Sequence, residues 1–167
     1  SHVFAHSDDI FMYKCENHRT MQPNADAIIE LFQHIMNVPG VGSSNATHGT
    51  LAGVLADPAM METLSAVLKA GPNNWIGLQV GLETGSATLA KKIMPLKMRP
   101  FTPEEWQDVI MGSMEILAKN YWIPAFTLII GLPQETTDDI YETIDIINRM
   151  EQIPNSHFSL APLAFVP

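Results

Sequence analysis

The sequence predicts an α/β fold built on a parallel β-sheet. Strand-like and helix-like segments alternate along the 167 residues, with about 25 to 40 residues in each unit, a pattern typical of βαβ crossovers. Residues 123–132 are apolar almost throughout, as strands of a parallel sheet are when helices cover both faces. Two architectures fit these observations: an open doubly wound sheet, and a barrel or partial barrel.

The first half of the chain predicts two strands and two helices. The strands are expected in residues 2–13 and 41–49, and the helices in residues 24–36 and 57–71. Asn24 is a suitable N-cap for the first helix, and the Pro39-Gly40 pair ends it. Asp57 caps the second helix, with Pro58 at its first position. In both helices the apolar residues recur at the spacing of one helical face.

The second half of the chain predicts three strands and three helices. The strands are expected in residues 75–82, 123–132 and 157–167, and the helices in residues 86–94, 102–120 and 136–150. The capping box of Thr102 and Glu105 is the clearest helix start in the sequence. In the last helix, we expect Ile140, Ile144 and Ile147 to form the buried stripe.

Composition and charge narrow the possible functions. The formal net charge is −9 at pH 7, so binding to nucleic acid or to an anionic membrane is not expected. No apolar stretch approaches the ~20 residues that span a bilayer, and no signal peptide opens the chain. The single cysteine, Cys15, rules out an internal disulfide and a metal site of several cysteines within this chain, and it suits a reducing cytosol. We therefore expect a cytoplasmic protein of one domain, or part of a larger one.

Polar residues cluster after the predicted strands. Both candidate architectures bind ligands beyond the carboxyl ends of their strands, so these residues form the candidate site. They are His6, Ser7, Asp8 and Asp9 after the first strand, Asn45, Thr47 and His48 after the second, Glu83, Thr84 and Ser86 after the third, and Gly131, Gln134 and Glu135 after the fourth. Acids and hydroxyls outnumber basic groups, which suits a ligand with an amine, ribose hydroxyls or a cation. The sequence contains neither a Walker loop nor a dinucleotide fingerprint.

Several of these positions also have a purely structural interpretation. Asp8 and Asp9 can cap a turn, and Glu83 can cap the helix that starts at Ser86. Glu135 suits the first turn of the helix that follows it, because acids are favourable at helix starts. Four basic residues crowd one short stretch: Lys91, Lys92, Lys97 and Arg99. This crowding indicates either a solvated helix end or a contact for an acidic substrate or partner domain.

Two segments together resemble the radical S-adenosylmethionine (SAM) enzymes. GLQVGLETGSATLAKKI, residues 77–93, is similar to the fourth strand and turn of that family, where a Gly-x-Glu-Ser/Thr-Gly-Ser pattern leads into a Leu-x-Lys-x-Ile-type helix. FTLIIGLPQETTDDIYETIDII, residues 126–147, is similar to the fifth strand and turn, commonly a Gly-Leu-Pro-Gly-Glu-Thr run before an acidic helix start. The two motifs occur in the family's order with a helix between them. The resemblance is strongest over residues 75–150.

The resemblance implies a fold, a cofactor and a reaction. The fold is a partial TIM barrel of the (β/α)6 type, with parallel strands, outer helices, and SAM across the carboxyl ends of the strands. In that family a CxxxCxxC loop after the first strand holds a 4Fe-4S cluster, and electron transfer then cleaves SAM to a 5′-deoxyadenosyl radical. This chain contains no CxxxCxxC. We therefore expect residues 1–167 to be a radical SAM core fragment with about strands 2 to 6, inactive alone, whose first strand and cluster ligands lie in an upstream segment of the same protein.

The resemblance also assigns SAM contacts to individual residues. The matched positions are Ser7, Asp8, Asp9, Asn45, Thr47, Glu83, Ser86, Ile130, Gly131 and Leu132. The acids after the first strand suit the SAM ammonium, Glu83 suits the ribose hydroxyls, and the backbone of residues 130–132 would frame the adenine. Gln134 departs from the pattern, because many relatives have glycine there. The resemblance assigns no catalytic residue, no metal ligand and no substrate within this chain.

Two other functions stay open at this point. An unrelated TIM-barrel enzyme that acts on a small polar metabolite would have no upstream cysteine triplet. A non-catalytic, barrel-derived interaction module would bind neither iron nor SAM. If the first strand is missing, the sheet edge at residues 2–6 is unpaired, and unpaired edges seek partners. We therefore expect this chain to dimerise or aggregate through that edge.

Overall fold

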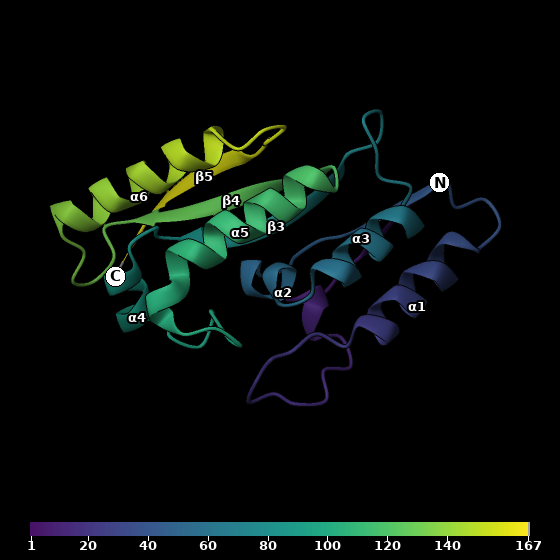
Figure 1. The fold of residues 1–167 in the computed structure, drawn as a ribbon, viewed down its shortest axis with the longest axis horizontal. Coiled ribbons are helices and arrows are strands. Elements are labelled where there is room, and N and C mark those ends of the chain that lie inside the picture. The colour runs from purple at the N-terminus through teal and green to yellow at the C-terminus, as the bar shows by residue number, and fades with distance from the viewer. Residues whose placement is uncertain (167) are drawn as a thin grey trace.

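The computed structural model describes residues 1–166 and has a mixed α/β fold. The strands (Figure 1) are β1 (His2–Ala5), β2 (Ser43–Ala46), β3 (Ile76–Glu83), β4 (Trp122–Ile130) and β5 (Ser159–Ala164). The α-helices are α1 (Ala25–Met36), α2 (Leu51–Ala56), α3 (Pro58–Val67), α4 (Ala87–Ile93), α5 (Trp106–Lys119) and α6 (Thr137–Glu151). Two short 3₁₀ helices, η1 (Ile10–Met12) and η2 (Pro103–Glu105), complete the described elements.

The paired strands run parallel and form two small sheets. β1 pairs with β2, and the second sheet has the order β3-β4-β5. One isolated parallel bridge, between His48 and Gln79, joins the two sheets. The predicted parallel strands and strand–helix alternation are therefore confirmed. Within residues 1–166 the strands do not close into a barrel, so the partial TIM barrel stays a prediction.

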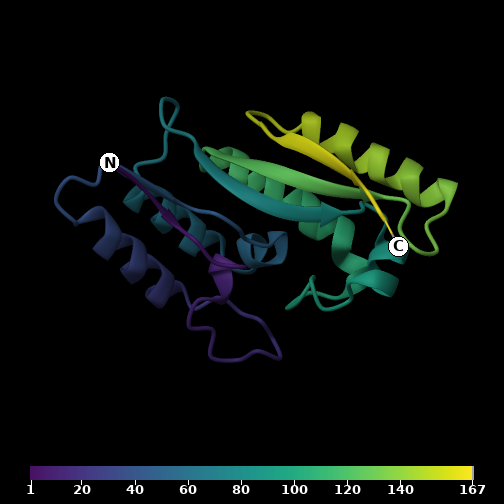
Figure 2. The ribbon, with the colours of Figure 1, turned by 180° about the vertical axis from the view of Figure 1, so that it is seen from behind.

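Helices cover one face of the sheets and leave the other face open. Figure 1 views the molecule from the helical side, and Figure 2 shows the strands from behind. Four alternate residues of β3 are buried against the helices: Ile76, Leu78, Val80 and Leu82. The residues between them are more exposed, and β4 alternates in the same way. The prediction that residues 123–132 are covered on both faces is therefore wrong, and we call the open side the inner face.

One hydrophobic core lies between the helices and the covered face of the sheets. Its largest fully buried aromatic side chains are Phe11, Phe32, Trp106, Trp122 and Phe126. Helices α2 and α5 meet in this core, where Ser113 Oγ donates a hydrogen bond to the Leu51 carbonyl oxygen at 2.7 Å. This contact connects the half of the molecule that contains β1 and β2 to the half that contains β3, β4 and β5.

The helix starts follow the local sequence signals. The side chains of Asn24, Asp57 and Ser86 each accept a hydrogen bond from a backbone N–H in the first turn of α1, α3 and α4. These bonds satisfy donors that a helix start would otherwise leave unpaired. The capping box of Thr102 and Glu105 also forms. It opens the 3₁₀ turn η2, so that α5 itself begins at Trp106.

Two helices differ from the sequence predictions. Helix α2 is missing from them, because LAGVLA is too short and too uniformly apolar to reveal a helical period. The buried residues of α6 are Asp139, Ile146 and Met150. The predicted stripe is wrong at Ile140 and Ile144, which are 39% and 48% exposed, and it is right at Ile147, which packs against the core.

The first strand has one partner among residues 1–166, because β1 pairs with β2 alone. Phe4 on this strand is 62% exposed. The dimer predicted at this edge stays a prediction. Over the same described range, no helix has both the length and the apolar character needed to cross a bilayer.

Candidate functional site at the strand ends

A cavity of about 460 Å³ lies at the carboxyl ends of the strands. Every strand or the turn after it contributes to the lining, through Asp8, His48, Gln79, Glu83, Thr127 and Ala161. Lys97 also lines the cavity, from the loop that follows α4. The volume is within the range of about 300–1,000 Å³ that is typical of small-molecule sites. We call this hollow the strand-end cavity.

Glu83 and Lys97 form an ion pair in the wall of the strand-end cavity. Lys97 Nζ lies 2.8 Å from Glu83 Oε1, and the two side chains are only 21% and 22% exposed. The other carboxylate oxygen, Glu83 Oε2, is buried and has no hydrogen-bond partner within residues 1–166. A buried acceptor without a partner is costly, so a ligand that donates a hydrogen bond there would gain stability.

The backbone at the end of β3 fixes the position of Glu83. The pairing of β3 with β4 contains a register shift between Gly81 and Glu83. Glu83 has a φ of 55°, in the left-handed region that residues other than glycine seldom adopt. The turn that follows is held by α6, because the Gly85 N–H donates to Thr143 Oγ1 at 2.9 Å. Backbone conformations of this kind are concentrated at functional sites.

Ser86 lies behind the cavity rather than in its lining. It is fully buried, and its Oγ accepts a hydrogen bond from the Leu89 N–H as the N-cap of α4. The same hydroxyl donates to Asp139 Oδ1 at 2.5 Å. The interpretation of Glu83 as the cap of this helix is therefore wrong, since Ser86 is the cap and Glu83 faces the cavity.

The three residues after β1 have different environments. Asp8 is exposed and lines the strand-end cavity. Asp9 instead caps η1, because its carboxylate accepts hydrogen bonds from the Phe11 N–H and from Thr50 Oγ1, both at 3.0 Å. Burial raises the pKa of Asp9, although these hydrogen bonds act in the opposite direction. Ser7 Oγ is buried and has no partner within residues 1–166. The capping interpretation is thus confirmed for Asp9, and Asp8 is the residue of this turn that lines the cavity.

Asn45 and Thr47 lie deeper on the inner face. They line a second, smaller cavity of about 200 Å³, which we call the inner-face cavity. Asn45 Oδ1 is 2.6 Å from His2 Nε2. Thr47 Oγ1 is 3.2 Å from Nδ1 of His6 and 3.1 Å from Nδ1 of His48. The two predicted residues therefore contact histidines on the inner face and are not part of the strand-end lining.

The turn after β4 does not contribute to the lining of the strand-end cavity. Ile130 is 55% exposed, and Leu132 is half-buried. Gly131 has a φ of 86°, and its N–H donates to Glu135 Oε2 at 2.6 Å. The prediction that Glu135 belongs to the first turn of α6 is wrong, because it lies before the helix and holds this turn. Gln134 has a φ of 69°, so it adopts the left-handed conformation that glycine favours.

Three polar residues of the strand-end cavity are absent from the sequence predictions: Thr50, Gln79 and Thr127. Lys97 appears there only as a member of the crowded basic stretch. The two-residue period of a strand places Gln79 on the same face as Gly81 and Glu83, so this period could have identified Gln79. The same period on β4 could have identified Thr127. Lys97 comes from an irregular loop, and no local pattern indicates that it reaches Glu83.

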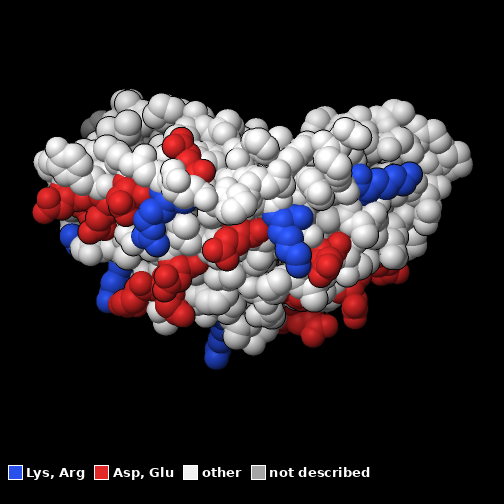
Figure 3. Space-filling view, turned by 45° about the horizontal axis from the view of Figure 1, so that its top comes forward, with Lys and Arg blue, Asp and Glu red and all other residues white. Residues whose placement is uncertain are grey.

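The crowded basic residues have two different roles. Lys91 forms an ion pair with Glu104 at 2.5 Å, and both side chains are 61% exposed, as expected for a solvated helix end. Lys97 instead pairs with Glu83 in the cavity wall. On the surface visible in Figure 3, acidic and basic side chains are interspersed and form no continuous basic patch.

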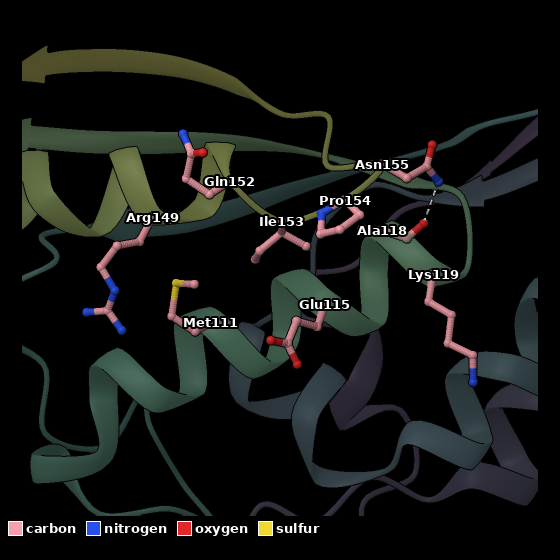
Figure 4. A pocket seen from close by; sticks show the side chains of 9 residues that line it. All are labelled: Met111, Glu115, Ala118, Lys119, Arg149, Gln152, Ile153, Pro154 and Asn155. Carbon is pink, nitrogen blue, oxygen red and sulfur yellow. Dashed lines mark hydrogen bonds between the residues drawn. The ribbon is translucent and has the colours of Figure 1, made fainter.

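A larger hollow, of about 590 Å³, lies on the helical side between α5 and α6. Figure 4 shows Met111 and Glu115 of α5 on one side of it and Arg149 of α6 on the other. At one end, Asn155 Nδ2 donates a hydrogen bond to the Ala118 carbonyl oxygen at 3.0 Å. The residues predicted from the sequence as a binding site do not line this hollow, so the strand-end cavity is the candidate site.

Metal-ligating side chains do not converge in the described part of the chain. Among residues 1–166, no group of three or more His, Cys, Asp or Glu side chains is arranged to hold a metal ion. Cys15 is buried, and its Sγ donates a hydrogen bond to the Gln22 carbonyl oxygen at 3.3 Å.

Comparison with known proteins identifies no family for this chain. No protein-family model matches it. No curated protein matches it either. The choice of function therefore depends on the residues and geometry of the strand-end cavity.

Proposed function

We propose that this chain is part of a radical SAM enzyme and that the strand-end cavity binds SAM. The observation that carries the proposal is the conformation of Glu83 at the end of a parallel strand, with the buried, unpartnered Oε2. Glu83 belongs to the first of the two segments that resemble radical SAM motifs. The second segment, residues 126–147, packs beside it, because Thr143 binds the turn that follows Glu83.

The residues of the strand-end cavity fit SAM in charge and in size. SAM carries an ammonium and a sulfonium cation, and the cavity has two acids, Asp8 and Glu83, against one base, Lys97. In the proposed complex Asp8 faces the ammonium, and Glu83 Oε2 accepts a hydrogen bond from a ribose hydroxyl. Gln79 and Thr127 supply further uncharged hydrogen-bonding groups.

The 4Fe-4S cluster does not fit the residues of this chain. The sequence has one cysteine, which is buried, and the described residues hold no group of metal ligands. The cluster would require cysteines outside residues 1–167, and the contribution of this chain is then to bind and orient SAM. When bound beside a reduced cluster, SAM supplies the 5′-deoxyadenosyl radical that defines the chemistry of this enzyme family.

The proposed partial TIM barrel is a more specific fold than the mixed α/β fold with parallel strands that the structure has. In this proposal β1 to β5 correspond to the second to sixth strands of the family barrel. Support comes from the parallel pairing, from the helices on one side only, and from the open inner face. The first strand would pair with the free edge of β1.

Titration of the chain with SAM, followed by ¹H–¹⁵N NMR, tests the proposed binding site. We expect shifts of the backbone amides of Asp8, Gln79, Gly81 and Thr127, with a Kd of about 1 mM, or about −4 kcal/mol, because no cluster anchors the ligand. S-adenosylhomocysteine lacks the sulfonium charge and is expected to bind more weakly. The absence of shifts at about 10 mM SAM would contradict the proposal. Equal shifts with uncharged sugars would favour an enzyme that acts on a small polar metabolite.

The activity is tested on the full-length protein. After anaerobic reconstitution with iron and sulfide, and addition of a reductant, we expect 5′-deoxyadenosine to form from SAM. A sample that contains the cluster but forms no 5′-deoxyadenosine would favour a non-catalytic interaction module instead.

Replacement of Glu83 by glutamine is expected to weaken SAM binding about tenfold, or by about 1.4 kcal/mol. The substitution keeps the length of the side chain but removes the negative charge of the carboxylate that accepts the ribose hydroxyl, and a charged acceptor makes the stronger hydrogen bond. Lys97→Gln is the matched control, because it removes the ion-pair partner and leaves the charge of Glu83 available. We expect this variant to bind SAM at least as tightly as the parent chain. If Glu83→Gln and Lys97→Gln both bound SAM as tightly as the parent chain, Glu83 would have no contact with the ligand.

Replacement of Gly81 by alanine is expected to weaken SAM binding about tenfold while it leaves the free energy of unfolding within about 1 kcal/mol. A Cβ at this position would overlap a carboxylate oxygen of Glu83 and Nζ of Lys97. Both atoms end flexible side chains, so the pair is displaced and the backbone stays in place. Gly77→Ala is the control on the same face of β3, since a Cβ there meets nothing within 4 Å. Thermal unfolding and NMR titration of both variants separate binding from stability.

A further inference from the structure

We propose that the inner-face cavity is a second binding site, for an uncharged planar ring that carries an amide group. The site lies toward the amino-terminal half of the strands, since Gly77 and Ile123 are the second residues of β3 and β4. It adjoins the strand-end cavity, because Gln79 and Ala125 line both hollows. The proposal does not depend on the binding of SAM.

The lining of the inner-face cavity selects against charge. Phe4, Asn45, Gln79 and Ile123 are among its lining residues, and no acidic or basic side chain is. A charged ligand would find no opposite charge in this lining. The cavity measures about 200 Å³. A dry cavity of about 150 Å³ is enough to hold benzene, so one substituted ring fits this volume.

Phe4 provides an aromatic surface for the ring. Its side chain is 62% exposed, although it is a large apolar group. The ring is held edge-to-face by His2, at 4.5 Å between centroids. His2 is itself fixed, with Nδ1 2.7 Å from Ser43 Oγ and Nε2 2.6 Å from Asn45 Oδ1. An exposed aromatic ring in a fixed position is a suitable stacking partner for a planar ligand.

Gln79 provides the polar recognition group. Its main-chain N–H and C=O bond to Thr47 and Gly49, whereas its exposed side-chain amide makes no hydrogen bond within residues 1–166. The amide of Asn45, by contrast, already bonds to His2, Ala46 and Gly77. A free glutamine amide can pair through two hydrogen bonds with an edge that presents a donor beside an acceptor. A carboxamide or a lactam presents such an edge.

The proposal is tested by NMR titration of the full chain with three ligands of the same size. Nicotinamide carries the amide, 3-acetylpyridine lacks its N–H donors, and nicotinate replaces the amide by a charged carboxylate. We expect nicotinamide to shift the side-chain amide signals of Gln79 and the ring signals of Phe4. Its affinity is expected to be about tenfold higher than that of either analogue, because they lose one hydrogen bond or bring an unpaired charge.

Two variants identify the site, and a third is the control. Gln79→Glu and Phe4→Leu are each expected to weaken nicotinamide binding at least about fivefold, because they remove the amide donor and the stacking surface. Leu163→Ala is expected to change nothing, since Leu163 is exposed on β5 and lines neither cavity. Equal affinity for the three ligands, shifts at Glu83 without shifts at Phe4, or no binding of nicotinamide would each overturn the proposal.

Discussion

Replacement of Trp106 by alanine is expected to lower the free energy of unfolding by about 4 kcal/mol. The indole is 1% exposed and belongs to the central core cluster, so its removal leaves a large cavity that the core cannot fill. Its Nε1–H also donates a buried hydrogen bond to the Thr84 carbonyl oxygen at 2.8 Å. Loss of this donor leaves a buried carbonyl group unpaired. Urea unfolding at pH 7, monitored by far-UV circular dichroism, measures the difference.

Two other tryptophan variants separate the effects of packing and hydrogen bonding. Trp106→Phe keeps most of the apolar volume but removes the N–H donor, so we expect it to cost about half as much as Trp106→Ala. Trp75→Ala removes a half-exposed ring that packs edge-to-face against Tyr121 and His157. Its expected cost is about 1–2 kcal/mol. A Trp106→Ala variant within about 1 kcal/mol of the parent chain would mean that Trp106 is not buried in the folded protein.

Replacement of Asp139 by asparagine is expected to lower the free energy of unfolding at pH 7 by about 3 kcal/mol. Asp139 is 6% exposed, and its carboxylate accepts three hydrogen bonds. Oδ1 accepts one from Ser86 Oγ at 2.5 Å, and Oδ2 accepts two from Thr136, from Oγ1 at 2.6 Å and from the backbone N–H at 2.8 Å. An asparagine has one acceptor oxygen in place of two, and its NH₂ group meets donors at the other position.

The cost of the Asp139→Asn substitution is also expected to depend on pH. The hydrogen bond from Ser86, and then that from Thr136, hold the pKa of Asp139 below its ordinary value. The carboxylate therefore stabilises the fold above the ordinary pKa of an aspartate, and this contribution is lost as the pH falls through the lower pKa of the folded protein. The difference in free energy of unfolding between the parent chain and Asp139→Asn should therefore shrink as the pH falls from about 5 to about 2.

Asp138→Asn is the matched control for Asp139→Asn. Asp138 lies in the same first turn of α6 but is exposed, so it contributes mainly through the helix dipole. We expect its replacement to cost less than about 1 kcal/mol at pH 7. Other carboxylates titrate equally in all of these proteins, so their contribution cancels in the comparison. If the loss of unfolding free energy caused by Asp139→Asn stayed constant from about pH 7 to about pH 2, the carboxylate would not be ionised in the folded protein.

The features that the sequence predicted well are those set by neighbouring residues. Asn24 and Asp57 act as the predicted caps because each lies three residues before the N–H group it binds. β3 and β4 form where apolar residues favour strands, and their parallel pairing follows from the helices that connect them. The alternation of β3 also places Glu83 in the cavity.

The features that the sequence did not predict depend on residues far apart in the chain. Ser86 and Asp139 are separated by 53 positions, and their hydrogen bond turns α6 so that Asp139 and Ile146 face inward. The spacing of the isoleucines in α6 therefore predicts the wrong buried face. Lys97 reaches Glu83 from a loop without a helical or strand period, and only the folded chain brings the two charges together.

The two sheets meet at a short seam around the parallel bridge between His48 and Gln79. Helix α2 packs against α5 on the helical side. On the strand side, the backbone of Gln79 bonds to Thr47 and Gly49, and Asn45 Nδ2 donates to the Gly77 carbonyl oxygen. Because His48 and Gln79 both line the strand-end cavity, a molecule bound there would contact both sheets. Such a molecule would hold the two sheets together. Hydrogen exchange of the backbone amides of Gln79 and Gly49 is therefore expected to slow when it binds.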